Sequence, residues 1–202
     1  MDAREIYLWL TDGAFNGGCD GFDTHVVASI VAIGVAEAKA EKRPIVDAVG
    51  LPGGELAALI RETFPHAKSM FDRLVDDTLG DTADDEVCLR DLLSCNATDG
   101  SDLQERLASM IARRAMRPNH LWQDLGLRNR RELSWLMLRH FEPLARRNHV
   151  DMKWKKFLYR AICRDEGYRL CPVPVCGDCD DFDRCFGDES GENLLSGGRL
   201  HA

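Results

Sequence analysis

The chain has 202 residues, of which 45 % are hydrophobic and 30 % charged, so it is long enough to bury one sizeable core. Its net charge of −8 argues against a general nucleic-acid binder, and no apolar run reaches the roughly 18 residues of a membrane span. Eight cysteines behind an N-terminus that lacks export-signal features predict a reducing, cytoplasmic location, in which clustered thiols bind metals.

Apolar residues in the first half of the chain recur at helical spacing. The pattern predicts helices over 2–11, 22–41, 51–64 and about 70–79, with a glycine-rich loop containing Cys19 after the first. The helix over 22–41 is expected to be the most buried, because its apolar stripe is the broadest. His25 on that helix is interpreted as a hydrogen-bonded core histidine and not as a metal ligand.

The second half continues in the same way, with predicted helices over 84–95, 102–116, 128–141 and 152–166. Cys88 and Cys95 are seven residues apart on the first of these and are expected to pack as small apolar groups. On the second helix we expect the basic side chains to lie outside the apolar stripe; they are Arg106, Arg113 and Arg114. On the last helix, Asp151 is the predicted N-cap and Gly167 the predicted C-terminal glycine.

No strand pattern of useful length occurs, so the predicted fold is all-α. We expect a single helical domain of about seven to eight helices over residues 1–170. A cysteine-rich, metal-binding loop over residues 171–187 follows it, and residues 188–202 are expected to form a flexible tail. Neither a serine-nucleophile motif, a zinc-protease motif nor a phosphate-binding glycine loop occurs, so no catalytic residue is assigned and the protein is not expected to be an enzyme.

Four cysteines in the last predicted segment are spaced C-x4-C-x2-C-x5-C; they are Cys171, Cys176, Cys179 and Cys185. Fifteen residues can bring all four sulfurs onto one small object, and the first three follow the run of plant-type ferredoxins, which favours an iron–sulfur type cluster. A structural zinc ion and two local disulfides are the alternatives. Zinc sites usually join two knuckles through a longer spacer, and disulfides suit an exported chain.

Other residues of this loop fit a cluster. Pro172 and Pro174 restrict the backbone and hold the first interval extended, and Gly177 permits a close approach to the cluster. Four aspartates crowd the same stretch, where carboxylates add hard oxygen ligands and disfavour further negative charge on the cluster; they are Asp178, Asp180, Asp181 and Asp183. Each of them is equally well interpreted as a solvated loop charge.

Basic and acidic residues are unevenly distributed along the chain. Residues 1–100 carry 8 basic and 19 acidic side chains, residues 101–170 carry 16 and 8, and residues 171–202 carry 2 and 7. A basic middle segment therefore leads into an acidic, cysteine-rich end. This segment would attract an oxyanion, a nucleic acid or an acidic partner protein, or it would simply neutralise the first half.

Three stretches of the second half together resemble the NifQ family of nitrogen-fixation proteins. They are NHLWQDLGLRNRRELSWLM at 119–137, DMKWKKFLYR at 151–160 and LCPVPVCGDCDDFDRCFG at 170–187. The resemblance implies a carrier that holds a molybdenum–iron–sulfur cluster, or a 4Fe–4S precursor, on the four cysteines. It also implies delivery of molybdenum to the scaffold that assembles the iron–molybdenum cofactor of nitrogenase, with the nitrogenase iron protein taking part. Neither membrane nor nucleic acid is an expected partner.

Molybdate is a dianion, so we expect the basic segment to attract it. The residues expected to do so lie near two predicted helix starts and are Arg128, Arg130, Arg131, Lys153, Lys155 and Lys156.

A DNA-repair protein of the helix-hairpin-helix type with an iron–sulfur loop is a further alternative, because Leu51 to Gly54 partly matches its hairpin. The missing second spaced glycine, the four-residue first interval of the cysteine loop and the acidic chain argue against it. A zinc-stabilised interaction protein is the third possible function.

Overall fold

The computed structural model describes residues 1–12, 20–165 and 182–196, and all the regular elements in these ranges are helices. The α-helices, several of them very short, are α1 (Ala3–Asp12), α2 (Gly21–Glu41), α3 (Ile45–Val49), α4 (Gly53–Thr63), α5 (Lys68–Phe71), α6 (Asp84–Ser94), α7 (Asp102–Ala115), α8 (Leu121–Asp124), α9 (Arg130–His140), α10 (Glu142–Arg147), α11 (Trp154–Asp165) and α12 (Phe182–Phe186). The predicted all-α class is confirmed. The helices of the described ranges exceed the expected seven to eight because α3, α8, α10 and α12 are too short to give a periodic sequence pattern.

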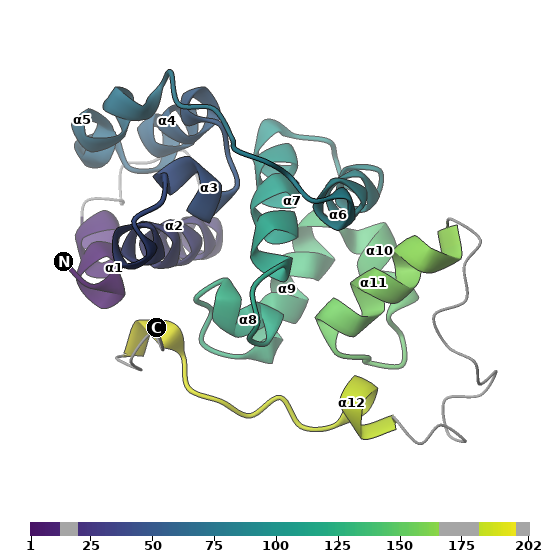
Figure 1. The fold of residues 1–202 in the computed structure, drawn as a ribbon. Coiled ribbons are helices and arrows are strands. Elements are labelled where there is room, and N and C mark those ends of the chain that lie inside the picture. The colour runs from purple at the N-terminus through teal and green to yellow at the C-terminus, as the bar shows by residue number, and fades with distance from the viewer. Residues whose placement is uncertain (13–19, 166–181, 197–202) are drawn as a thin grey trace.

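Helix α2 lies at the centre of the N-terminal half and packs against α1 and α3 (Figure 1). Its N-cap is Asp20, whose side chain accepts hydrogen bonds from the amides of Phe22 and Asp23. By length and composition α2 could cross a membrane, but 83 % of its most apolar stretch is buried inside the protein. The side chain of His25 is 12 % exposed and hydrogen-bonds to Tyr7 and Glu132, so the interpretation of a hydrogen-bonded, largely buried histidine is confirmed.

The second half is built around α7, which packs against α6, α3 and α8. Helix α9 packs against α8 and α10, and α11 lies against α6. After α12 the described part of the chain runs along the lower side of these helices in Figure 1 and reaches α1 at the short 3-10 helix η5 (Leu194–Ser196). Leu195 is only 8 % exposed and Leu194 packs beside it, so this part of the expected flexible tail packs on the body.

The prediction of one helix near residues 70–79 is wrong. The structure instead has short α5 followed by a 3-10 turn, Asp72–Leu74, and non-helical residues from 77 onward. The backbone turns here because it must reach the start of α4, where the amide of Gly53 donates to the carbonyl oxygen of Asp77 at 2.9 Å. A continuing helix would need that carbonyl for its own hydrogen bonds.

Two adjacent glycines at the start of α4 predict opposite responses to alanine. A Cβ on Gly53 would lie 1.5 Å from the carbonyl oxygen of Leu74, whereas one on Gly54 would meet only the oxygen of Val75 at 3.8 Å. We expect Gly53→Ala to lower the free energy of unfolding by about 2–3 kcal/mol through overpacking. Gly54→Ala is expected to leave it unchanged or raise it by up to about 1 kcal/mol, since alanine favours helix. Urea unfolding of both variants tests this, and equal losses would contradict it.

The two cysteines predicted to lie on the helix over 84–95 differ in burial. Cys88 is half-buried and packs against the core, as predicted. Cys95 is exposed, so the expectation that it packs as a buried group is wrong. The cause is that α6 ends at Ser94 and Cys95 already belongs to the turn. Cys19 and the side chain of Cys163 lie outside the described residues, as does Gly167.

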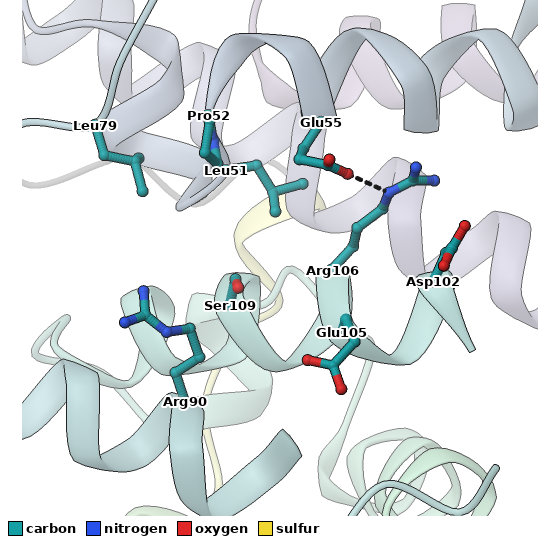
Figure 2. Close-up of a pocket in the computed structure, with 9 residues that line it drawn as sticks. All are labelled: Leu51, Pro52, Glu55, Leu79, Arg90, Asp102, Glu105, Arg106 and Ser109. Carbon is teal, nitrogen blue, oxygen red and sulfur yellow. Dashed lines mark hydrogen bonds and ion pairs between the residues drawn. The ribbon is translucent and has the colours of Figure 1, made fainter. Parts of the chain in front are cut away.

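Helices α4, α6 and α7 enclose a pocket of about 470 Å³ (Figure 2). Arg106 of α7 extends across it and donates to Glu55 of α4 at 2.9 Å, and it also donates to Glu62 at 2.6 Å. Arg106 is only 8 % exposed, so the prediction that it lies outside the buried face is wrong. The charged part of the pocket lining consists of three carboxylates and two arginines, and the lining contains neither cysteine nor histidine.

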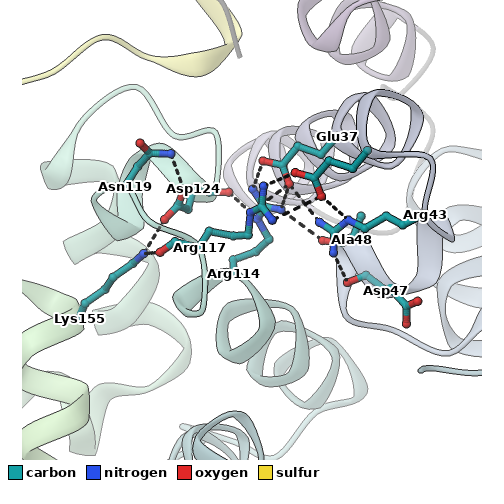
Figure 3. Close-up of polar contacts among 10 residues, drawn as sticks. Glu37, Arg43, Asp47, Ala48, Arg114, Arg117, Asn119, Asp124 and Lys155 are labelled. Carbon is teal, nitrogen blue, oxygen red and sulfur yellow. Dashed lines mark hydrogen bonds and ion pairs between the residues drawn. The ribbon is translucent and has the colours of Figure 1, made fainter. Parts of the chain in front are cut away.

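Arg114 of α7 is fully buried, which also contradicts the prediction (Figure 3). Its two terminal nitrogens donate to both carboxylate oxygens of Glu37 on α2, at 2.6 and 2.8 Å. Its Nε donates to the carbonyl oxygen of Asp124 at 2.7 Å. Burial raises the pKa of Glu37, but the hydrogen bond and positive charge of Arg114 outweigh this effect, and the pKa lies below its ordinary value. This ion pair joins α2, α7 and α8 through the centre of the molecule.

The same network extends to α11. Lys155 donates from Nζ to Oδ2 of the fully buried Asp124 at 2.5 Å, and Asn119 donates to Oδ1 at 3.0 Å (Figure 3). Burial lowers the pKa of Lys155, and the negative charge of Asp124 opposes this only in part. Lys155 therefore holds α11 against α8 and is not available to an incoming anion, contrary to the prediction.

Candidate metal centre

The structure places one of the four predicted ligand cysteines. Cys185 lies on α12, whereas Cys171, Cys176 and Cys179 lie outside the described residues. Whether the four sulfurs meet therefore stays a prediction, as does the division into a helical domain and a cysteine-rich loop. Within the described ranges no three histidine, cysteine, aspartate or glutamate side chains are grouped as metal ligands. The predicted loop is the candidate centre because of its cysteine spacing.

Cys185 is held in place by its backbone and its packing. Lys153, just before α11, donates from its amide to the carbonyl oxygen of Cys185 at 2.8 Å, and from Nζ to the carbonyl oxygen of Asp183 at 3.0 Å. Cys185 and Phe186 are half-buried against the hydrophobic core. The last predicted ligand thus sits on the short helix α12, beside the N-terminal end of α11.

Both ends of the cysteine segment are attached to the same helix. Helix α11 leads into the segment at Asp165, and Lys153 holds the far end of the segment at the other end of α11. The twelve residues of α11 span about 18 Å. Residues 166–181 have a fully extended reach of about 50 Å, well beyond that distance. Chain length therefore permits all four thiols to gather beside α11.

Arg130 fixes the start of α11, a role that sequence reasoning missed. Its Nη2 donates to the carbonyl oxygen of Asp151 at 2.9 Å, to Oδ1 of Asp151 at 2.7 Å and to the carbonyl oxygen of Met152 at 2.9 Å. Its Nη1 pairs with Glu189, beyond α12. Burial lowers the pKa of Arg130, but hydrogen bonds to Asp151 and Glu189 outweigh it and the pKa is raised. Arg130 thus links α9, α11 and the segment that follows Cys185.

The turn before α11 is also fixed by its own residues. Asn148 is buried; its side chain donates to the carbonyl oxygen of Met152 and accepts from the Met152 amide, both at 2.9 Å. Asp151 has a left-handed φ of 53°. The prediction that Asp151 is the N-cap is wrong, because α11 begins three residues later and the Asp151 carboxylate binds Arg130 instead.

The six basic residues predicted to attract molybdate have different environments. Besides the paired Arg130 and Lys155, Lys153 is hydrogen-bonded to Asp183, and the guanidinium of Arg131 lies 5.1 Å from the centre of the Trp135 ring. Arg128 is 66 % exposed at its side chain, with Glu132 at 3.5 Å as its ion-pair partner among the described residues. Lys156 is exposed. The structure therefore does not present the six as one open anion site.

Comparison with known proteins gives one consistent result. The family model NifQ matches residues 26–187, which include all four cysteines. The chain is 37 % identical to the NifQ homolog of Sinorhizobium fredii, over 89 % of this chain and 78 % of the relative. It is 39 % identical to NifQ of Rhodobacter capsulatus, over 78 % and 86 %, and 35 % identical to NifQ of Azotobacter vinelandii, over 70 % and 78 %. No solved structure matches.

Proposed function

This chain belongs to the NifQ family of nitrogen-fixation proteins, and from that premise we propose that it carries a molybdenum–iron–sulfur cluster and donates molybdenum for cofactor assembly. The observation that carries the proposal is the C-x4-C-x2-C-x5-C spacing inside the matched segment. Thiolates are soft donors that bind iron and reduced molybdenum well. The four ligands would be Cys171, Cys176, Cys179 and Cys185.

The anchoring of Cys185 supports a carrier and not a catalyst. Its attachment to Lys153 holds the last ligand beside the N-terminal end of α11, and in the sequence the other three ligands lie between α11 and α12. A donor requires ligands that another protein can reach, and segments that connect helices are usually exposed. We propose the nitrogenase cofactor scaffold and the nitrogenase iron protein as partners, molybdate as the source of the metal, and the cytoplasm as the location.

The hairpin that favoured a DNA-repair protein has another explanation. Gly53 is required because the backbone of Leu74 lies where a Cβ would be. The short match at Leu51 to Gly54 is therefore accounted for by packing of α4 and does not favour DNA binding.

The metal content of the protein tests the proposal. We expect the full chain, purified without oxygen from cells grown with molybdate, to be brown and to contain both iron and molybdenum, with electron paramagnetic resonance signals of a reducible cluster. Iron–sulfur charge transfer causes the colour, and zinc gives none. Zinc in place of iron would contradict the proposal and support the zinc-stabilised interaction protein.

A further inference from the structure

A pocket of about 420 Å³ lies at the start of α9, next to the segment that follows Cys185. The N-terminal end of α9 and residues beyond α12 contribute most of its lining. The lining residues are Trp122, Arg128, Asn129, Arg130, Arg131, Asp188, Glu189, Ser190 and Gly191. The pocket thus joins a rigid helix start to the segment that holds the last predicted ligand.

The pocket favours a small anion. Three arginines line it against two carboxylates, and the N-terminus of the eleven-residue α9 adds a partial positive charge. The side chain of Arg128 is 66 % exposed, and its contact with Glu132, at 3.5 Å, is loose. Arginine is the side chain best suited to oxyanions, because its planar fork donates two parallel hydrogen bonds.

Trp122 provides a second observation. It lines the pocket, it is only 3 % exposed, and its Nε1 donor has no acceptor within the described part of the chain. A buried donor without an acceptor is unfavourable by about 1–3 kcal/mol. A small shift of the neighbouring segment on anion binding would allow a bound oxygen to relieve it.

In the structure the carboxylate of Glu189 lies beside Arg130, where an external anion would bind. Its side chain is 7 % exposed; one carboxylate oxygen pairs with Arg130 and the other lies 3.3 Å from Nδ1 of His120. The carboxylate is part of the same chain, so it competes with any external anion at a high effective concentration. A dianion brings twice the charge of a carboxylate to the same arginines, and this favours its binding in place of Glu189.

We propose that this pocket binds a tetrahedral dianion that displaces Glu189 from Arg130, and that this displacement releases residues 187–196 from the body. The backbone that carries Cys185 is directly connected to these residues, so the anchor of the cysteine segment loosens when the dianion binds. This last consequence rests on the proposed function, because it concerns the ligand segment. The binding site itself does not.

Two substitutions in the released segment test the exchange. The full-length protein is titrated calorimetrically with sulfate, phosphate and molybdate at fixed ionic strength and pH. We expect Glu189→Gln to raise the affinity at least tenfold over the unmodified chain for at least one of the three. Glu192→Gln is the matched control, since the Glu192 side chain is exposed and only its backbone oxygen is bound, to Gln123 at 3.0 Å. Its affinity should equal that of the unmodified chain.

A third substitution and a second measurement keep the test decisive. Arg128→Gln should lower the affinity of the Glu189→Gln chain about tenfold, and it removes an exposed side chain whose loss leaves the fold intact. Saturation with the dianion should speed amide hydrogen exchange of residues 187–196 in the unmodified chain. A preference for molybdate would identify the metal source as the ligand, and equal binding would identify a general oxyanion site.

Equal affinities of the Glu189→Gln, Glu192→Gln and unmodified chains, or no binding by any of them, would overturn this inference. Such a result would leave the proposed function standing if the protein still contains iron and molybdenum. Conversely, dianion binding by a protein that contains zinc and no iron would contradict the proposed function alone.

Discussion

Serine in place of any one of Cys171, Cys176, Cys179 or Cys185 is expected to remove most of the iron and nearly all of the molybdenum from the anaerobically purified protein. A serine hydroxyl is a hard, weakly acidic donor and replaces thiolate poorly on iron or reduced molybdenum. Loss of one ligand would also open the proposed cluster to solvent. We expect iron per chain to fall at least fivefold, measured by elemental analysis and by the visible absorbance.

The fold should survive these substitutions. In Cys185→Ser the carbonyl oxygen that accepts from Lys153 is unchanged, so the helical content and the unfolding midpoint of the metal-free protein should match those of the unmodified chain. Cys95→Ser is the matched control, because Cys95 is exposed at the end of α6, and it should retain full metal. Full iron and molybdenum in all four ligand variants would show that the cluster is not bound there.

The second large effect is expected at the buried ion pair of α2 and α7. Arg114→Ala should lower the free energy of unfolding by about 3–5 kcal/mol, the usual effect of breaking a buried pair by removing one partner. Glu37 then loses its two-pronged partner while its side chain stays only 5 % exposed, and the carbonyl oxygen of Asp124 loses a donor. Urea unfolding measures the change.

Arg146→Ala supplies the comparison, because Arg146 and Glu142 form an exposed pair one turn apart. We expect a change of at most about 0.5 kcal/mol there. A loss below about 1 kcal/mol in Arg114→Ala would mean that Arg43 and Arg117, which lie 3.3 and 3.5 Å from Glu37, replace the missing guanidinium.

Acid adds a second measurement of the same pair. The folded-state pKa of Glu37 is lowered, so the stability that its ionisation supplies is complete above about pH 4.3, the ordinary value for glutamate. It is lost as the pH falls below that value through the folded-state pKa. Between pH 5 and pH 3 the free energy of unfolding should therefore fall less steeply with pH in Glu37→Gln than in the unmodified chain. If the free energy of unfolding fell equally steeply in both chains, Glu37 would be excluded as a cause of acid unfolding.

Local sequence pattern was sufficient for the longer helices. The apolar spacing of α2, α7 and α9 predicts them to within a few residues, because burial of one face repeats every 3.6 residues. The pattern also held a signal for Arg114, which lies three residues after Ile111 and seven after Leu107, on the apolar stripe itself. A basic residue at such a position is buried only where a partner exists, and this partner is 77 residues away.

The candidate site likewise combines a local sequence signal with contacts that only the fold reveals. Cysteine spacing and the family resemblance identify the predicted ligands, since four thiols in fifteen residues form a local signal. The contacts that hold Cys185 are long-range: Lys153 is 32 positions before it, and Arg130 is 59 positions before Glu189. Periodicity carries no information about such pairs, and several of these residues are equally plausible as surface charges.

Attachment of the ligand segment to both ends of α11 has a thermodynamic consequence. Bringing together the ends of a chain the length of residues 166–181 lowers its entropy by an amount equivalent to about 2.5 kcal/mol, apart from a constant. Folding of the helical body has already imposed this restriction before any metal arrives. If the segment binds a metal as proposed, closure of its ends would not reduce the metal-binding free energy, and loss of the metal would not require the body to unfold.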